Sequence, residues 1–216
     1  MSQWMSQWVS QWGSCGQAWV ALMRHVIEAA ELASDDRGPV LEGPPVLFEI
    51  IRLGWNDPLI TRFAEASAVE LYTRKFTSTS TYAPFKYSYG ARLREFQGVD
   101  QLAWVRRLLT ERPHSKSGWI SLTGPGERPD AVPCLTGLAF RARREALQMS
   151  AVFRSQNAYT SYLNYLPLRD LQAGMAAALG LPCGPMRVYV DVPHLYMADA
   201  GRVKAILSAV PAPERG

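Results

Sequence analysis

The sequence is poor in the residues that build structural metal sites and disulfide frameworks. It has 3 cysteines and 3 histidines among 216 residues, and none of them stand at a zinc-ligand spacing such as C-x-x-C or H-x-x-x-H. An odd number of cysteines in a chain of this length favours a reducing compartment over a set of disulfides. We therefore expect no metal site and a cytoplasmic protein.

Charged residues and long apolar runs are also scarce. Charged residues make up 19% of the chain, the formal net charge is +4, and no charged residue precedes Arg24. No run reaches the ~18 apolar residues that a membrane span needs. The opening lacks the basic region and the continuous apolar stretch of a secretory signal peptide. The small positive surplus is not gathered into one segment, so we expect neither a membrane nor a nucleic acid as partner.

Apolar residues are plentiful, at 48% of the chain with 11% aromatic, and this excludes disorder for the chain as a whole. The first twelve residues, MSQWMSQWVSQW, repeat a Ser-Gln-Trp unit with a period of four. We assign residues 1–16 to a low-complexity extension, interpreted either as a disordered terminus or as an anchor for a membrane or a partner. Residues 17–216 are expected to form one domain.

Hydrophobic periodicity predicts a mixture of helices and strands. The predicted helices cover residues 17–30, 46–53, 99–112, 165–179 and 198–209. The predicted strands cover residues 119–122, 135–141, 147–153 and 186–192, the middle two joined as an antiparallel hairpin by the turn at 143–145. Residues 34–39 read as a turn and residues 77–89 as a loop. Without an alternating βαβ rhythm, this pattern indicates an α+β fold.

One cysteine stands where its thiol could react. Cys134 follows a proline and opens a predicted strand, although a free cysteine is more often a buried apolar residue. Arg154-Ser155 ends the partner strand of the predicted hairpin and would lie beside Cys134. An arginine stabilises a thiolate, and with a hydroxyl it also forms an anion site. Three further polar residues lie on elements that could meet the same site: Asn164, His194 and Tyr196.

These residues, in this order and close to this spacing, resemble the thymidylate synthase family. The matching segments are Val132-Pro133-Cys134, Phe140, Arg154-Ser155, Asn164, Leu179-Gly180, Asp191-x-x-His194-x-Tyr196 and, upstream, Asp36-Arg37, Leu47-Phe48-Glu49-Ile50-Ile51 and Tyr89-Gly90. The resemblance covers about residues 17–207 and is strongest from 115 to 197. It implies a thymidylate synthase-like fold for the domain 17–216, with a mixed β-sheet packed with helices, and a homodimer formed sheet to sheet.

The resemblance implies a transferase that moves a one-carbon unit from 5,10-methylenetetrahydrofolate to C5 of a pyrimidine nucleotide monophosphate. It implies three catalytic residues: Cys134 as the nucleophile that adds to C6, Glu49 for water and proton transfers, and Tyr89 for removal of the C5 proton. The substrate-binding residues it implies are Arg37, Arg154, Ser155 and, from the partner subunit, Lys116 for the phosphate, Asn164 for the base, and His194 and Tyr196 for the sugar. Asn157 stands where the family has an aspartate that holds the pterin ring of the folate.

Several positions depart from the family pattern. Lys116-Ser117 replaces a pair of arginines, which removes bidentate clamping of the phosphate. The short interval between Arg37 and Glu49 predicts that a strand pair is missing there. The family's tryptophans before Tyr89 are absent, and the aromatic residues of that stretch are Tyr72, Tyr82, Phe85 and Tyr87.

Loss of these shielding tryptophans bears on the product, because a site open to water favours addition of water over hydride transfer. The expected product is therefore a hydroxymethylated uridylate or cytidylate, with reductive methylation of dUMP as the alternative. An asparagine at 164 offers a donor and an acceptor and leaves the base open, although in the family it accompanies uracil. Two further hypotheses remain: a catalytically weak nucleotide-binding homologue, and a member with a non-nucleotide substrate.

Overall fold

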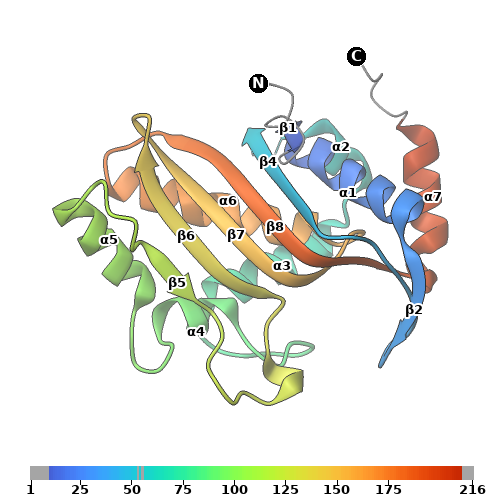
Figure 1. The fold of residues 1–216 in the computed structure, drawn as a ribbon, viewed down its shortest axis with the longest axis horizontal. Helices are drawn as coiled ribbons and strands as arrows, with labels where there is room; N and C mark the ends of the chain where they lie inside the picture. Colours follow the sequence, from blue (N-terminus) through green and yellow to red (C-terminus); the bar gives the residue numbers. More distant parts are fainter. Residues whose placement is uncertain (1–9, 53, 55, 211–216) are drawn as a thin grey trace, which may run out of the picture.

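The fold is organised around one 8-stranded sheet (Figure 1). The structure, a computed structural model, describes residues 10–52, 54 and 56–210. Its strands are β1 (Ser10–Ser14), β2 (Glu31–Asp35), β3 (Gly38–Glu42), β4 (Val46–Arg52), β5 (Trp119–Ser121), β6 (Leu135–Arg143), β7 (Ala146–Asn157) and β8 (Cys183–Tyr196). Its helices are α1 (Cys15–Ala29), α2 (Pro58–Phe63), α3 (Ala66–Thr77), α4 (Tyr89–Arg94), α5 (Gln101–Glu111), α6 (Tyr162–Ala178) and α7 (Ala200–Ala209), with the short 3-10 helices η1 (Pro129–Ala131) and η2 (Met197–Asp199).

The sheet is mixed, with strand order β1-β4-β8-β7-β6-β5 and the β2–β3 hairpin attached to β8 through β3. The pairs β1–β4 and β7–β8 are parallel, and the other pairs are antiparallel. β8 pairs with β4 through residues 186–190 and with β3 through residues 194–196. The end of β8 therefore lies between the end of β7 and the β2–β3 hairpin, which brings three segments distant in sequence to one end of the sheet.

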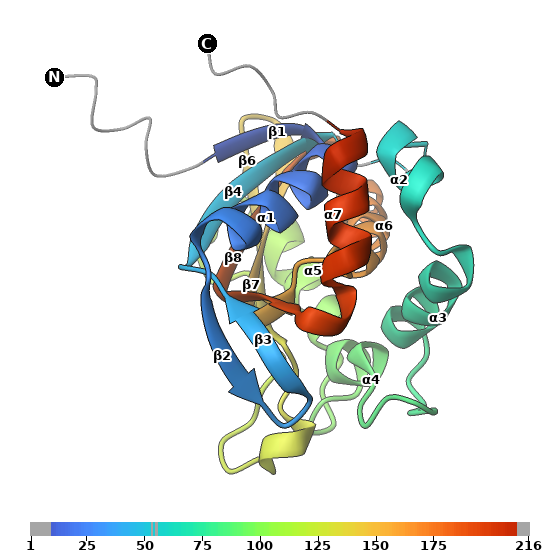
Figure 2. The same ribbon diagram turned by 90° about the vertical axis from the view of Figure 1, so that its right-hand side faces the viewer.

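Helices cover one face of the sheet and leave the other face open (Figure 2). On β7, the side chains of Leu147, Met149, Ala151 and Phe153 are buried, while the residues between them are only half-buried. The Phe153 ring lies 6.4 Å from the Tyr165 ring of α6, so the buried face of β7 packs against that helix. This alternation confirms the half-buried strand that the sequence predicts.

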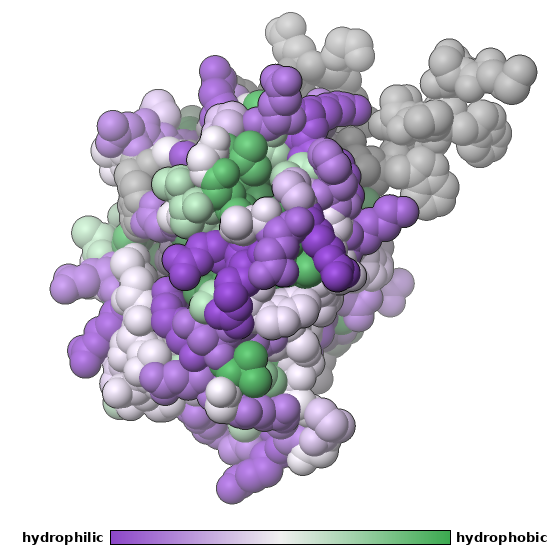
Figure 3. Space-filling model, turned by 90° about the vertical axis from the view of Figure 1, so that its left-hand side faces the viewer, coloured by the Kyte–Doolittle hydropathy of each residue, from purple (hydrophilic) through white to green (hydrophobic). Residues whose placement is uncertain are grey.

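The open face carries apolar side chains that remain partly exposed. Leu47, Trp119 and Tyr189 are 39%, 46% and 37% exposed. Leu47 and Tyr189 face each other across β4 and β8. The Trp119 ring lies over Gly137 on β6, where a Cβ atom would overlap it. These three side chains stand on β4, β5 and β8. By contrast, the end of the molecule that carries α5 is mostly hydrophilic, with small separate apolar patches (Figure 3).

Most predicted elements are present with shifted ends. The helices predicted over 17–30, 99–112, 165–179 and 198–209 are α1, α5, α6 and α7, and the predicted strands are β5, β6, β7 and β8. The hairpin turn also lies where it is predicted. Arg144 and Glu145 at its centre have φ of 51° and 61°, as a two-residue turn that matches strand twist requires.

The helix predicted over 46–53 is wrong, because this segment is the strand β4. Phe48 and Ile50 are buried toward α1, while Leu47 and Ile51 project from the open face. Buried and exposed residues therefore alternate with a period of two, as in a strand. In so short an apolar run, periodicity alone cannot distinguish a strand from a helix. The segment assigned to a plain turn at 34–39 is the tip of the β2–β3 hairpin.

β3 and the first residues of β4 occupy the interval between Arg37 and Glu49, where the short spacing predicts that a strand pair of the family is missing. At the amino-terminal side, residues 10–16 of the expected extension form β1 and the first turn of α1. Ser14 caps that helix by accepting a hydrogen bond from the Gln17 amide. Residues 1–9, which hold most of the Ser-Gln-Trp repeat, lie outside the described residues.

Candidate active site

Cys134 lies immediately before β6, at the end of the sheet where β7 and β8 finish. Its side chain is half-buried, and the Ser155 hydroxyl donates a hydrogen bond to its sulfur at 3.6 Å. The Arg154 amide donates to the Cys134 carbonyl at 2.9 Å. The hairpin thus places Arg154-Ser155 beside the thiol, as the sequence predicts.

The Arg154 guanidinium holds the loop that precedes the cysteine. Its Nε donates to the Pro133 carbonyl at 3.1 Å, and a terminal nitrogen donates to the Val132 carbonyl at 3.0 Å. These bonds use two of the five N–H groups of the side chain. The remaining donors and the positive charge stay available to an anion, because the residue is exposed.

A second arginine, which the sequence analysis missed, anchors the other side of this loop. Arg92 on α4 is buried and donates to the carbonyls of Leu122 and Ala131, at 2.6 and 3.0 Å. It also forms an ion pair with Glu127 at 2.7 Å. The path of the chain into Cys134 is therefore set by buried charge-assisted bonds, which are stronger than neutral ones.

Two tyrosine hydroxyls accept hydrogen bonds from the backbone at Cys134 and Leu135. The Tyr87 hydroxyl accepts a hydrogen bond from the Cys134 amide at 3.4 Å, and the Tyr89 hydroxyl accepts one from the Leu135 amide at 3.2 Å. Tyr89 is fully buried, and this burial raises its pKa well above the usual value. The structure thus brings Tyr89 to Cys134, and it adds Tyr87.

Behind these tyrosines lies Lys75 of α3, which the sequence analysis did not single out. Its ammonium lies over the rings of Phe85, Tyr87 and Tyr89, with Nζ-to-centroid distances of 4.2, 4.3 and 4.6 Å. The side chain is 6% exposed, and burial lowers its pKa to about 8. A lysine in an amphipathic helix carries no local signal for this environment, since the rings come from a later loop and from α4.

The β2–β3 hairpin contributes a second polar cluster at the same end of the sheet. The Tyr196 hydroxyl donates to Asp35 at 2.9 Å, and the Arg37 guanidinium lies 5.7 Å from the centre of the Tyr196 ring. Burial and the bond to Asp35 raise the pKa of Tyr196 to about 12. The His194 ring packs edge-on against Tyr196 at 5.2 Å, and burial lowers its pKa.

Strand register and electrostatics connect the two clusters. Ser155 pairs with Val192, and Asn157 pairs with His194, so β7 and β8 carry their polar residues side by side. Burial is the main cause of the raised pKa of Tyr196, and the negative charge of a Cys134 thiolate raises it further. Eight of the predicted site residues are thereby grouped at one end of the sheet. Arg37 lies on the adjoining hairpin tip, and the other seven are Tyr89, Cys134, Arg154, Ser155, Asn157, His194 and Tyr196.

Three predicted residues lie elsewhere or make no contact with this group. The Glu49 carboxylate is bound on the open face by Arg187, at 3.0 Å, and by Gln11, at 2.8 Å. Lys116 is exposed in the loop before β5. Asn164 is half-buried in the first turns of α6, and within the described part of the chain its side chain has no hydrogen bond to the Cys134 site.

Asn157 is held by neighbours of its own. Its side-chain oxygen accepts a hydrogen bond from the Tyr159 amide at 3.0 Å, and its nitrogen lies 3.5 Å from the carboxylate of Asp199 on η2. A carboxylate from another element thus lies beside Asn157. The sequence analysis missed Asp199, because it lies 42 residues further along the chain.

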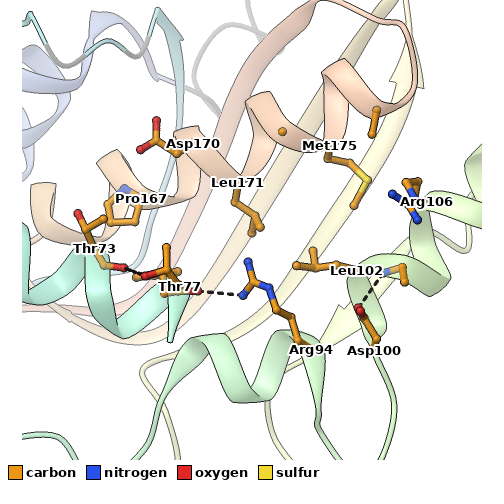
Figure 4. A pocket seen from close by; sticks show the side chains of 14 residues that line it. Thr73, Thr77, Arg94, Asp100, Leu102, Arg106, Pro167, Asp170, Leu171 and Met175 are labelled. Carbon is orange, nitrogen blue, oxygen red and sulfur yellow. Dashed lines mark hydrogen bonds between the residues drawn. The ribbon is translucent and has the colours of Figure 1, made fainter. Parts of the chain in front are cut away.

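A cavity of about 390 Å³ lies away from this site, among α3, α5 and α6 (Figure 4). Thr73 and Thr77 line it from α3, Leu102 from α5, and Leu171 and Met175 from α6. None of the predicted site residues lines it. The Cys134 site is accordingly recognised by its chemistry and not by the size of a cavity.

Residues 10–52, 54 and 56–210 contain neither a candidate metal site nor a candidate membrane-spanning helix. No group of three or more histidine, cysteine or acidic side chains is placed to hold a metal ion. No helix in that part of the chain has the length and apolar character needed to cross a membrane.

The chain is similar in sequence to several archaeal proteins that share one name. The chain is 26% identical over 204 residues to a Methanococcoides burtonii protein named "Putative thymidylate synthase", covering 89% of this chain and 91% of that protein. A Methanosarcina mazei protein of that name is 26% identical over 201 residues, with the same coverage, and one from Methanothermobacter thermautotrophicus is 31% identical over 148 residues, covering 67% of this chain and 66% of its own. No family model matches the chain. These similarities support a thymidylate synthase-like family without pointing to a particular member.

Proposed function

We propose that this chain is a one-carbon transferase of the thymidylate synthase family that acts on C5 of a pyrimidine nucleotide monophosphate. The observation that carries the proposal is the Cys134 site, where a thiol, the Ser155 hydroxyl, the Arg154 guanidinium and the buried Tyr89 come together. The relatives named for the same activity support it.

The nucleophile in this proposal is the thiolate of Cys134. After the thiol gives its proton to solvent water, its sulfur forms a bond to C6 of the base, the C5–C6 π bond opens, and the electron pair moves onto C5 and O4. The Ser155 hydroxyl, which already donates to the sulfur, stabilises the thiolate before addition. C5 then carries the negative charge that it needs to attack an electrophilic carbon.

Arg154 and Arg37 are proposed to bind the nucleotide phosphate. Both are exposed, so their guanidinium groups can be reached by a ligand. Arg154 keeps three N–H donors after its bonds to the loop, which suffices for a bidentate contact with phosphate. His194 and Tyr196, beside Arg37, are proposed to contact the sugar, and Asn164 the base edge.

Lys116 can join this site only from a second subunit. The Arg143 guanidinium at the far end of β6 donates to the His114 carbonyl, which places the loop of Lys116 at that end. β6 begins at Cys134's neighbour Leu135 and ends at Arg143, and nine residues span roughly 25–30 Å in a strand. We therefore propose a homodimer that buries the open sheet face, with its exposed Leu47, Trp119 and Tyr189.

The residues around Asn157 fit the proposed cosubstrate, 5,10-methylenetetrahydrofolate. When bound, this cosubstrate supplies the one-carbon unit. Asp199 offers a carboxylate that accepts hydrogen bonds from amino and ring N–H groups, and Asn157 holds it by a hydrogen bond. Glu49 is proposed to act in water and proton transfers, although its carboxylate is bound by Arg187 and Gln11.

The proposed product is the 5-hydroxymethyl nucleotide of a uridylate or cytidylate, with reductive methylation of dUMP as the alternative. The segment that replaces the family's tryptophans places a lysine ammonium among tyrosine rings next to the nucleophile. The family's indole rings are absent from this segment, and loss of their shielding favours addition of water.

The test is incubation of the protein with 5,10-methylenetetrahydrofolate and each of UMP, dUMP, CMP and dCMP, followed by mass spectrometry of the products. A gain of a hydroxymethyl or a methyl group decides the product and names the base. The matched control is Cys134→Ser, which removes the nucleophile and leaves the fold. If the wild type neither transforms a nucleotide nor releases its C5 hydrogen, the enzymatic proposal is wrong.

A second candidate is a nucleotide-binding homologue with weak catalysis. The replacement of the arginine pair by Lys116-Ser117 and the loss of the carboxylate at Asn157 favour it. It predicts that nucleotides bind equally well to the wild type and to Cys134→Ser, with no release of the C5 hydrogen by either protein.

A further inference from the structure

Lys75 is held in an aromatic cage directly behind the nucleophile. Its ammonium lies 4.2 to 4.6 Å from the ring centres of Phe85, Tyr87 and Tyr89, and 5.5 Å from that of Tyr72. Cations attract the faces of aromatic rings, and this attraction strengthens when water is excluded. The cage therefore fixes a positive charge at this point of the fold.

This charge has no partner of opposite sign. Among residues 10–52, 54 and 56–210, no carboxylate or other hydrogen-bond acceptor lies within bonding distance of the Lys75 Nζ, and the side chain is 6% exposed. Burial of an unpaired ammonium is costly, and it lowers the pKa of Lys75 to about 8. A methionine would fill the same space without that cost, so packing alone does not account for a lysine here.

The cage connects Lys75 to the cysteine through two tyrosines. The hydroxyls of Tyr87 and Tyr89 accept hydrogen bonds from the Cys134 and Leu135 amides, while their ring faces hold the ammonium. The Cys134 thiolate in turn raises the pKa of Lys75. Coupling between two sites is reciprocal, so the ammonium favours the thiolate as much as the thiolate favours the ammonium.

We propose that Lys75 is a positioning residue of the Cys134 site, whose caged ammonium stabilises the anionic form of the cysteine sulfur and the negative charge that follows its addition to the base. The second half of this statement rests on the proposed function. The first half rests only on the geometry of the folded protein.

Other charged and titratable groups face this pair from each neighbouring element. Arg37 comes from the β2–β3 hairpin, Arg154 from β7 and Tyr196 from β8, while Tyr72 lies on the same helix as Lys75. Arg37 and Arg154 are exposed, so water and salt screen their charges. The buried Lys75 acts through a medium of lower polarity. At a given distance, its charge therefore stabilises the thiolate more than an exposed charge does.

The experiment measures the reactivity of the cysteine without any substrate. Alkylation of the full chain by iodoacetamide is followed from pH 6 to 10 by mass spectrometry of the Cys134 peptide, in a Cys183→Ser background. Lys75→Met should move the pH midpoint of alkylation upward by about half to one unit, which slows alkylation at pH 7.5 about 3- to 10-fold. At pH 10 the rates should converge.

Two matched variants separate charge from packing. Lys75→Arg keeps the positive charge and should keep the wild-type profile. Lys86→Met removes an exposed lysine whose charge is paired with Asp130, and it should also behave as the wild type. A wild-type profile for Lys75→Met, or an equal shift in Lys75→Arg, would overturn the proposal.

A reciprocal measurement leaves Lys75 in place and covers the case in which its variants do not fold. The titration of Lys75 is followed by NMR of isotope-labelled lysine in the wild type and in Cys134→Ser. The amine should lose its proton at a lower pH in Cys134→Ser, because the thiolate no longer stabilises the ammonium, and equal midpoints would refute the coupling. If the wild type does not release the C5 hydrogen, the proposed function is wrong. The alkylation and lysine-titration measurements would still test the coupling between Lys75 and Cys134.

Discussion

Replacing Lys75 by methionine should make the protein more stable at neutral pH. Within the part of the chain that the structure describes, the lysine is buried without a counter-charge, and burial lowers its pKa from 10.5 to about 8. In the unfolded chain the side chain is solvated and binds its proton up to about pH 10.5. At this side chain the unfolded state therefore binds more protons than the folded state between pH 8 and 10.5, so the contribution of Lys75 to the free energy of unfolding rises with pH in this window.

The size of the effect follows from the same two values. The difference between 10.5 and about 8, at about 1.4 kcal/mol per pH unit, gives about 3 kcal/mol as the largest cost of the buried charge at pH 7. The cation–π attraction of the cage offsets about 0.5 to 2 kcal/mol of this cost. We expect Lys75→Met to raise the free energy of unfolding by about 1 to 2 kcal/mol at pH 7, and to lose this advantage progressively as the pH rises through 10.5.

The assay is urea unfolding of the wild type, Lys75→Met and Lys86→Met at pH 7, 8.5 and 10, followed by fluorescence. Lys86→Met controls for the loss of a lysine charge, because Lys86 is exposed. Groups that titrate in the same window in all three proteins cancel in the comparison. A Lys75→Met protein that is less stable than the wild type at pH 7, or a difference that does not change with pH, would refute the reasoning.

Three further outcomes are expected. Cys134→Ser should abolish release of the C5 hydrogen from a tritiated nucleotide while its circular dichroism spectrum stays that of the wild type; residual release at the wild-type rate would contradict its role. Asp57→Ala should lower the free energy of unfolding by about 2 to 3 kcal/mol in urea, because the buried carboxylate accepts from the Gly16 amide at 2.7 Å and caps α2. Tyr196→Phe should raise the pKa of Asp35 toward its usual value, since it removes a hydrogen bond that helps to lower it, and NMR titration of the carboxyl measures the change.

Much of the site follows from local sequence and from one hairpin. Alternation in 147–153 and a turn at 143–145 predict the β6–β7 hairpin, and this hairpin alone brings Ser155 to the Cys134 sulfur. The register of such a hairpin is set by turn length and by the buried face, both of which are readable in the sequence. The grouping of Tyr89, His194 and Tyr196 with them follows from the family resemblance.

The errors have a common physical cause. The apolar pattern of a short run such as 46–52 is compatible with a helix and with a strand. Only its pairing with β8 makes it a strand. The same pairing carries Glu49 to Arg187 on the open face, where no local pattern could place it. Long-range partners override local propensity in such segments.

The sequence by itself determined the class of the fold and the placement of Ser155 and Arg154 beside Cys134, because these depend on periodicity and on one local hairpin. Only the tertiary structure decided the other surroundings of Cys134. The cage of Lys75 joins α3 to a loop and to α4, and the carboxylate beside Asn157 comes from Asp199 on η2. Electrostatic effects depend on distance and burial in space, and neither is written in the order of the residues.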